Sequence, residues 1–279
     1  MLKSKDNPLI KKIRKLLAYP RFREEQREFV LEGFKIIHDT LSGRFSSAPF
    51  IRTLLFSTRT RAIAGNKVRD LMALASRKGI PIIEVSDSLM DRIKSRHTNQ
   101  EVIALAKWID QSLEEVIKSG IDEMQEGVPL FIGLCGVQDP GNLGALIRTA
   151  HAGSATAVLV FEGCADVYNP RTVRGSMGSL FAIPIVRSLT WKESLALLKK
   201  KEIRIYATSS AGSLRYTEVD FQRPSLILFG SEGKGIPESY LDFTDGSICI
   251  PMAGGVDSLN VNASAAIILY ERLRKLSIS

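Results

Sequence analysis

Three glycine-rich turns carry the polar side chains that could do chemistry in this sequence. Each follows a short apolar segment, and they span residues 136–144, 229–237 and 250–260. The first turn leads into an apolar helical run that contains one arginine, Arg148. An arginine is almost never fully buried unless it is paired or used, and it stays charged at neutral pH. We therefore expect Arg148 to bind a phosphate or a developing negative charge, with a surface charge or a buried ion pair as the alternatives.

Four further polar residues in these turns are candidates for the same site. Asn142 lies six residues before Arg148 and could cap a helix or orient a substrate. Glu232 could hold its own loop or pair with an arginine. Ser258 and Asn260 precede the last expected helix, where capping residues are common, and they could equally face a pocket. Each of the four therefore has a structural and a functional interpretation.

None of the three turns is a standard nucleotide-binding loop. GSEGKG in the second turn has its glycines in the order G-x-x-G-x-G, the reverse of the dinucleotide fingerprint. It also lacks the first glycine and the Ser or Thr of a phosphate loop. A dinucleotide-dependent enzyme is accordingly disfavoured.

Alternating strands and helices must position these turns. The nearly continuous apolar strands of the second half are typical of a parallel sheet covered on both faces, and ligands of such sheets bind beyond the carboxyl ends of the strands. The second half predicts strands at 129–137, 156–163, 203–210, 224–230 and 246–252 and helices at 143–152, 191–201 and 259–276. The first half predicts helices at 8–18, 24–41, 65–79 and 87–119 and strands at 49–57 and 80–86.

The bulk composition is that of a globular α/β protein. The 279 residues suggest two domains at roughly 150 residues each. No apolar run reaches the roughly 20 residues that span a bilayer, so no membrane partner is expected. The N-terminus has no secretory signal, although its basic, amphipathic character leaves an organellar transit peptide open. Three widely spaced cysteines and three histidines fit a reduced cytoplasmic protein without a metal site.

Positive charge is concentrated at the N-terminus. The net charge is +8, and residues 1–23 contain eight basic side chains against one acidic side chain. Such a stripe is typical of a protein that binds a polyanion, although a solvated helix face is the alternative. The candidate RNA contacts are Lys11, Lys12, Arg14 and Lys15, with Arg174 as a further candidate whose alternative is an ordinary ion pair.

The three turns together resemble the signature motifs of the SpoU/TrmH branch of the SPOUT RNA methyltransferases. The first motif is Asn142-x-Gly144-x-x-x-Arg148-Thr-Ala, the second LFGSEGKGI (228–236) and the third IPMAGGVDSLNV (250–261). The segment VYNPRTVRGSMGSLFAIPIV (167–186) also resembles the family. After SLNV the chain reads Asn262-Ala-Ser-Ala, a departure from the family's small-plus-valine pattern that is conservative in size.

The resemblance implies an α/β fold whose parallel sheet contains a deep trefoil knot. It also implies a homodimer with the active site at the subunit interface, and S-adenosylmethionine as the cofactor. The family positions expected to contact the cofactor are Phe229, Gly230, Ile250, Met252 and Leu259. The catalytic set implied by the resemblance is Asn142, Arg148, Glu232, Ser258 and Asn260.

The N-terminal region resembles, more weakly, a substrate-binding domain with the fold of an RNA-binding ribosomal protein. The expected organisation is an N-terminal RNA-binding domain (1–118), a linker (119–128) and a methyltransferase domain (129–279). We therefore expect S-adenosylmethionine-dependent methyl transfer to a ribose 2′-hydroxyl, with rRNA favoured over tRNA. The alternatives are a non-catalytic RNA-binding protein that keeps the fold and a small-molecule α/β enzyme.

Overall fold

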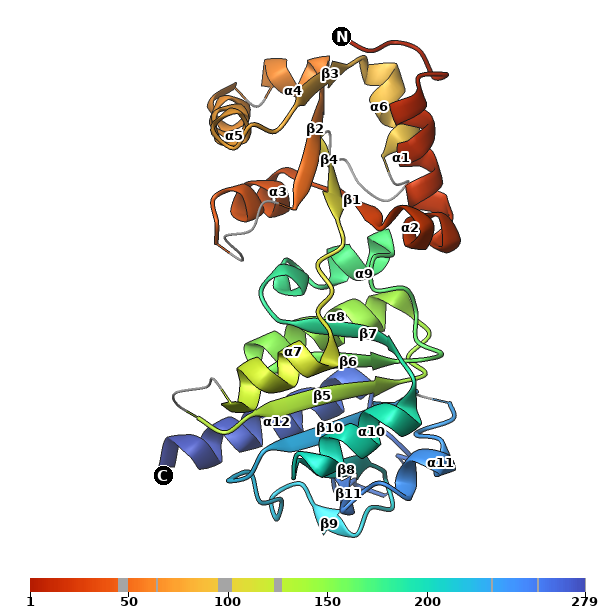
Figure 1. The fold of residues 1–279 in the computed structure, drawn as a ribbon, viewed down its shortest axis with the longest axis vertical. Coiled ribbons are helices and arrows are strands. Elements are labelled where there is room, and N and C mark those ends of the chain that lie inside the picture. The colour runs from red at the N-terminus through yellow and green to blue at the C-terminus, as the bar shows by residue number, and fades with distance from the viewer. Residues whose placement is uncertain are drawn as a thin grey trace. The chain divides into compact units, whose positions relative to one another are not determined.

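The chain forms two compact units that do not follow its linear order. The computed structural model describes residues 1–44, 50–63, 65–94, 102–122, 127–231, 233–254 and 256–278 (Figure 1). The first unit contains Met1–Ile109 together with the later segment Tyr168–Phe181. The second contains Asp110–Val167 and Ala182–Ser279. No helix within the described ranges is both long enough and apolar enough to cross a membrane.

The first unit is a four-stranded sheet with helices on both faces. The strand order is β1-β4-β2-β3, with β4 antiparallel to both neighbours and β2 parallel to β3. Helices α1 and α6 cover one face, and α3 and α5 cover the other (Figure 1). The elements are α1 (Pro8–Ala18), α2 (Pro20–Gln26), β1 (Glu28–Glu32), α3 (Phe34–Leu41), β2 (Ile51–Ser57), α4 (Thr58–Ile63), α5 (Gly65–Arg77), β3 (Ile82–Val85), α6 (Asp87–Ile93), β4 (Val102–Lys107) and α9 (Pro170–Gly175).

Helix α1 forms as predicted because both its start and its buried face are specified locally. The Asn7 side chain accepts a hydrogen bond from the Leu9 N–H at 2.9 Å, and Pro8 occupies the first helical position. Ile10, Ile13 and Leu16 are fully buried on the sheet side, which leaves the basic residues between them at the surface.

Two helix predictions for the first unit were wrong in part. The expected helix at 24–41 is interrupted by β1, because Arg27 adopts a left-handed conformation (φ 49°) that ends α2. The expected helix at 87–119 contains β4, whose first five residues are buried between β1 and β2. Both segments have apolar residues that also fit a helix, and long-range strand pairing decides their conformation.

The later segment Tyr168–Phe181 is anchored in the first unit by aromatic contacts. Tyr168 is fully buried, and its ring lies 5.1 Å from that of Trp108 and 4.6 Å from that of Phe29. Its hydroxyl accepts a hydrogen bond from the Ile109 N–H at 2.8 Å. At the other end of the segment, Phe181 stacks on Phe50 at 5.1 Å. Both ends of the segment that contains α9 are thereby held within this unit.

The second unit is a parallel sheet, as the sequence predicts, with β7 and β9 in addition to the five expected strands. The strand order is β7-β6-β5-β10-β8-β11-β9, and every pairing between these strands is parallel. Helices α8 and α12 pack together on one face, and α7 and α10 cover the other (Figure 1). The elements are α7 (Leu113–Ile117), β5 (Leu130–Cys135), α8 (Pro140–Ala152), β6 (Ala157–Phe161), β7 (Ile185–Leu189), α10 (Trp191–Lys200), β8 (Arg204–Thr208), β9 (Leu214–Arg215), β10 (Ser225–Gly230), α11 (Glu238–Leu241), β11 (Gly246–Cys249) and α12 (Val261–Ile278).

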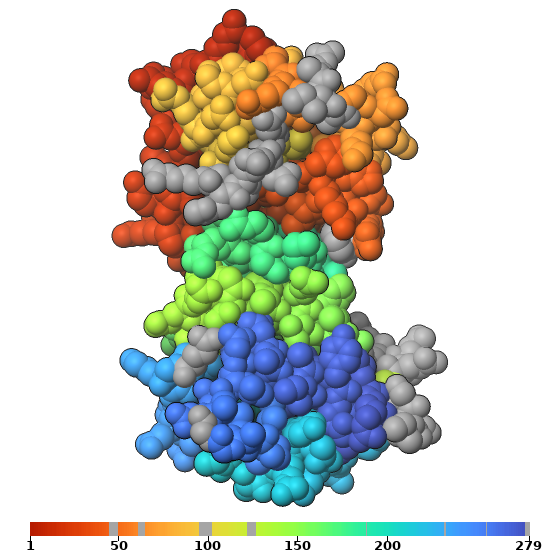
Figure 2. Space-filling model, turned by 180° about the vertical axis from the view of Figure 1, so that it is seen from behind, coloured from red at the N-terminus to blue at the C-terminus, as the bar shows by residue number. Residues whose placement is uncertain are grey.

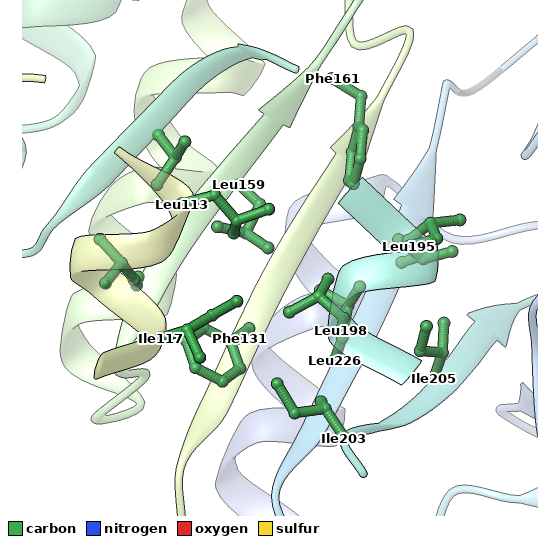
Figure 3. Close-up of a cluster of buried hydrophobic side chains, with 14 of the residues drawn as sticks. Leu113, Ile117, Phe131, Leu159, Phe161, Leu195, Leu198, Ile203, Ile205 and Leu226 are labelled. Atoms are coloured by element: carbon green, nitrogen blue, oxygen red, sulfur yellow. The ribbon is translucent and has the colours of Figure 1, made fainter. Parts of the chain in front are cut away.

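An apolar core lies between the central strands and helices α7 and α10. Figure 3 shows Leu113 and Ile117 of α7 and Leu195 and Leu198 of α10 directed at Phe131 and its neighbours in the sheet. All six side chains of β5 are buried. Because these strands bury both faces, polar groups gather in the turns at the strand ends.

The parallel register brings the ends of β5, β10 and β11 to one edge of the sheet, with β8 between β10 and β11. Gly230 at the end of β10 pairs with Cys135 at the end of β5, and Leu228 pairs with Ala207 of β8. Ile248 of β11 pairs with Thr208. The three glycine-rich turns therefore open at one edge of the sheet.

At the opposite edge, Asp245 fixes the start of β11. Its side chain is 19% exposed; one oxygen accepts a hydrogen bond from the Ile205 N–H at 2.7 Å, and the other lies 2.7 Å from Lys199 Nζ. Burial alone would raise the pKa of this carboxyl, but the hydrogen bonds from Lys199 and Ile205 outweigh it and hold the pKa below its usual range. Since the folded pKa is the lower one, the carboxylate stabilises the fold above the unfolded pKa, and this contribution is lost as the pH falls through the folded pKa.

We expect Asp245→Asn to reduce the free energy of unfolding by about 1 kcal/mol at pH 7, because the pair is partly exposed and one hydrogen bond is neutral. The difference from the wild type should shrink as the pH falls below about 4. Urea titrations at several pH values measure it, with exposed Asp70→Asn as the control. A difference in the free energy of unfolding between variant and wild type that stays constant down to pH 2 would contradict this role of the Asp245 carboxylate.

Candidate active site at the strand ends

A cavity of about 470 Å³ lies where the turns after β8, β10 and β11 meet the start of α12. Its walls combine apolar side chains with hydroxyl groups and exposed main chain, a mixture typical of sites for ligands of drug or cofactor size. We call it the first cavity; it is lined by Ala207, Thr208, Ser209, Ser210, Phe229, Gly230, Ser231, Lys234, Gly235, Ile236, Leu241, Ser247, Ile248, Ile250, Met252, Ser258, Leu259, Val261, Ser264 and Ile268.

Gly230 is required by the close approach of its own turn. A Cβ at this position would lie 2.2 Å from the Gly235 carbonyl carbon and 2.5 Å from the Ile236 nitrogen. Ser231 and Gly235 exchange two backbone hydrogen bonds of 3.2 and 2.9 Å, and Gly235 has a φ of 65°. The turn is therefore closed by main-chain contacts that any side chain at residue 230 would displace.

The first cavity brings together all five residues predicted to contact the cofactor. These residues come from two of the three motifs: Phe229, Gly230, Ile250, Met252 and Leu259. Ile250, Met252 and Leu259 are half-buried, so their side chains can pack while their main chain remains available to a ligand. The apolar walls suit an adenine ring, and the hydroxyl groups of Thr208, Ser209 and Ser210 suit a ribose. The residues present therefore fit an adenosine-containing cofactor.

A second cavity of about 480 Å³ adjoins the first at the Ser231–Gly235 turn. Four residues line both hollows, namely Ser231, Lys234, Gly235 and Val261. The remaining walls of the second cavity are Cys135, Gly136, Val137, Gln138, Asp139, Asn142, Glu162, Gly163, Gly233, Pro237 and Tyr240. A space beside the first motif thus adjoins the space that holds the predicted cofactor contacts.

Asn142 lines the second cavity and is not the helix cap. Asp139 caps α8 instead, because its Oδ1 accepts a hydrogen bond from the Asn142 N–H at 2.9 Å. The Asn142 side chain accepts from Asn262 Nδ2 at 3.4 Å, which links α8 to α12. The capping interpretation of Asn142 was therefore wrong, and its amide faces the pocket region.

The third motif divides its residues between structure and pocket. Asn260 caps α12, since its Oδ1 accepts from the Asn262 N–H at 2.9 Å. Ser258 is exposed and lines the first cavity. Glu232 lies outside the described residues, so its predicted place in the catalytic set stays a prediction.

Arg148 is not brought together with the other candidates in this chain. It lies on the exposed side of α8, and the lining of neither described cavity includes it. Helical side chains lean toward the N-terminus, which would bring its guanidinium back toward the strand ends. Within one chain the arginine instead faces outward from the helix pair α8–α12.

Two ionisable groups beside the second cavity are held neutral. Burial raises the pKa of the Cys135 thiol, and the neighbouring Cys164 raises it further. Burial likewise raises the pKa of the Tyr240 phenol. Neither group can take a proton from a substrate at neutral pH. Within the described ranges, no three His, Cys, Asp or Glu side chains gather to hold a metal ion.

The predicted RNA contacts fall in different places. Lys11, Arg14 and Lys15 line one hollow of the first unit. Lys12 instead forms an ion pair with Glu28 at 2.5 Å, and Arg174 is exposed outside that hollow.

One residue of the basic N-terminal stripe has a structural role. Arg23 is only 1% exposed, and it donates a hydrogen bond to the Leu16 carbonyl at the end of α1. The stripe therefore contains fewer surface charges than the sequence suggests.

Sequence reasoning missed several residues of these hollows. Lys234 lines both cavities, and its place inside the second motif was the available signal. Arg92, Lys94 and Arg171 join the α1 residues in the first unit, and only the tertiary fold brings them there.

Comparison with known proteins identifies both parts of the chain. Residues 129–270 match the SpoU rRNA Methylase family, and residues 7–104 match the MRM3-like substrate binding domain. The chain is 28% identical to the 23S rRNA (guanosine(2553)-2′-O)-methyltransferase RlmP of Bacillus subtilis over 96% of this chain and 97% of that protein. It is 31% identical to the 23S rRNA (guanosine-2′-O-)-methyltransferase RlmB of Pseudomonas syringae, over 76% and 84% of the two chains.

The fold matches a solved structure over almost its whole length. The SpoU methyltransferase AviRb of Streptomyces viridochromogenes, crystallised with S-adenosylmethionine (AdoMet), superposes with a TM-score of 0.85 at 26% identity, covering 97% of this chain and 98% of that one. The motifs, the parallel sheet and these matches agree, and the chain belongs to the SpoU rRNA methylase family.

Proposed function

We propose that this protein transfers a methyl group from S-adenosylmethionine to a ribose 2′-hydroxyl of RNA, with rRNA as the favoured acceptor. One observation carries the proposal: all five predicted cofactor contacts line the first cavity, which shares a wall with the second cavity beside Asn142. The relatives named as 23S rRNA 2′-O-methyltransferases support the choice of acceptor.

In this proposal the first cavity holds the cofactor and the second cavity receives the target nucleoside. The cofactor supplies an electrophilic methyl group when bound. The chain contributes mainly by holding donor and acceptor in line where the two cavities meet, beside the Ser231–Gly235 turn. Asn142 orients the acceptor, and Ser258 lies on the donor side.

The proton of the 2′-hydroxyl does not pass to Cys135 or Tyr240, because burial keeps both protonated. We assign Arg148 as a fixed positive charge that binds the target phosphate or the developing alkoxide. Arginine side chains are cationic in proteins, so we favour this role over that of a proton acceptor. Phosphate oxygen or water takes the proton.

We further propose a homodimer in which Arg148 completes the site of the partner chain. Helices α8 and α12 lie side by side on one face of the second unit (Figure 2). On this face Arg148 is exposed, and Tyr270 of α12 is 56% exposed, a large ring for a free surface. A second copy on this face would cover Tyr270 and give Arg148 a partner site.

The proposal includes three features that rest on the resemblance or on composition. They are the trefoil knot of the C-terminal domain, the domain limits 1–118, 119–128 and 129–279, and a cytoplasmic location.

The direct test is incubation of the protein with labelled S-adenosylmethionine and total RNA. We expect label in rRNA, on ribose rather than base, when the product is digested to nucleosides. Cofactor binding without transfer would favour the non-catalytic RNA-binding protein. Label on a base would contradict the proposed reaction.

Gly230→Ala should abolish measurable cofactor binding, because its Cβ would displace the main chain of Gly235 and Ile236. Isothermal titration of S-adenosylmethionine measures the loss, and thermal unfolding shows whether the fold persists. Gly233→Ala is the matched control in the same turn, since a Cβ there meets nothing within 4 Å. Equal affinity of both variants for S-adenosylmethionine would show that the first cavity is not the cofactor site.

Arg148→Lys should lower turnover on saturating RNA by about a hundredfold, because lysine keeps the charge and loses the planar pair of donors. Cofactor affinity should stay unchanged, and Arg223→Lys, an exposed arginine outside both cavities, should be fully active. Near-normal turnover of Arg148→Lys would refute bidentate binding.

Mixing inactive Arg148→Ala and Asn142→Ala chains tests the shared site. If Arg148 acts across a dimer, random pairing should restore about a quarter of wild-type turnover, since half of the dimers are mixed and each has one intact site. Chains that act within themselves would show no recovery.

A further inference from the structure

A hollow of about 650 Å³ in the first unit has a charged and aromatic lining. It lies where the C-terminal half of α1, the end of α6 and the start of α9 meet, and all of its residues belong to this unit. We call it the basic groove; it is lined by Lys11, Arg14, Lys15, Leu17, Ala18, Tyr19, Arg92, Lys94, Asn169, Pro170 and Arg171.

The groove is strongly positive. Its lining contains six lysines and arginines and no acidic residue. Lys11 pairs with Asp6 at 3.1 Å and Lys94 with Asp91 at 2.8 Å, so two of the charges are partly balanced. Arg14, Lys15 and Arg92 have no ion-pair partner within the described ranges. Such a concentration of charge favours an extended polyanion over a small ligand.

An exposed aromatic ring stands among these cations. Tyr19 is 61% exposed, which is unusual for a residue held between two helices. Its N–H donates to the Lys15 carbonyl at 2.8 Å, and Pro20 starts α2 directly after it. The backbone beneath the ring is therefore fixed, and the ring is presented to solvent. Rings of this kind among basic side chains stack the bases of unpaired nucleic acid.

One wall of the groove comes from the later segment of the chain. Asn169 caps α9 by accepting a hydrogen bond from the Arg171 N–H at 2.9 Å. Tyr168, next to it, is buried against Trp108 and Phe29. These contacts fix the backbone that carries Arg171 relative to α1, so the groove is a preformed surface.

We propose that the basic groove binds an unpaired stretch of RNA, with its phosphates on Arg14, Arg92 and Arg171 and one base stacked on Tyr19. The identity of this RNA as the methyl acceptor rests on the proposed function, and the binding chemistry does not. Duplex RNA could use the cations but offers no free base to the Tyr19 ring.

The first test is the affinity of the full chain for a labelled single-stranded RNA of about 12 nucleotides, within the usual range of site sizes. We expect Arg14→Glu with Arg171→Glu to weaken binding at least tenfold and to lower the log–log salt slope by about 1.4, at 0.7 per phosphate contact. Arg69→Glu with Arg77→Glu on α5, which covers the opposite face of the sheet, is the matched control. An effect no larger than that of the control would overturn the proposal.

The second test concerns Tyr19. Tyr19→Ala should weaken binding of the same RNA by between about five- and a hundredfold without changing the salt slope, and Tyr19→Trp should restore it. A blunt duplex of the same length should bind more weakly, and Tyr19→Ala should leave its affinity unchanged. Equal binding of single strand and duplex, or an inert Tyr19→Ala, would overturn the assignment of an unpaired base.

These measurements separate the groove from the proposed function. Groove variants should bind S-adenosylmethionine normally and keep their turnover at saturating RNA while the half-saturating RNA concentration rises. If the wild type transfers methyl groups and the groove variants bind RNA normally, the proposed RNA binding by the groove is wrong and the proposed function stands. If the wild type transfers no methyl group but the groove variants lose affinity for RNA, the proposed function is wrong and the proposed RNA binding by the groove stands.

Discussion

The parallel pairing of β5, β10 and β8 is the constraint on which the candidate active site depends. Ser225 pairs with both Leu130 and Arg204, and the register continues from there to the carboxyl ends of the strands. The central strands are buried on both faces, so polar groups cannot interrupt them without a large desolvation penalty. Polar functional side chains must therefore lie in the turns or in the helices that follow them, as Asn142 and Arg148 of α8 do, and the register determines which turns meet.

The Ser231–Gly235 turn converts this register into two separate spaces. It is closed by main-chain contacts beside Gly230, and its residues line both cavities. Ser231, Lys234 and Gly235 line both cavities, so ligands in the two spaces would meet at this turn. Cys135 and Tyr240 in the lining of the second cavity stay protonated and cannot act as bases, which fits chemistry driven by placement and by a fixed charge.

The sequence predicted the second unit well because its strands are short apolar runs bounded by glycine turns. The family, the parallel sheet and the clustering of Gly230, Ile250 and Leu259 followed from those turns and the resemblance. Strands β1 and β4 were missed, since their apolar residues also fit a helix and their pairing joins segments far apart in sequence. The outward position of Arg148 could not be predicted from the local sequence, because the place of a residue within a helix does not determine which other parts of the protein cover its side chain. The knot and the roles of the individual site residues stay predictions.

The aromatic anchoring of Tyr168–Phe181 also constrains the order in which the chain can fold. Phe29 lies in the N-terminal strand β1, yet two of the rings that cover it, Tyr168 and Phe181, are translated much later. At roughly 5–20 residues per second, the first unit waits several seconds with this surface open while the intervening strands emerge. A fragment ending at Ile109 would contain every strand of its sheet and still expose an aromatic patch. This protein is therefore poorly suited to separation into two independently folding pieces by a single cut.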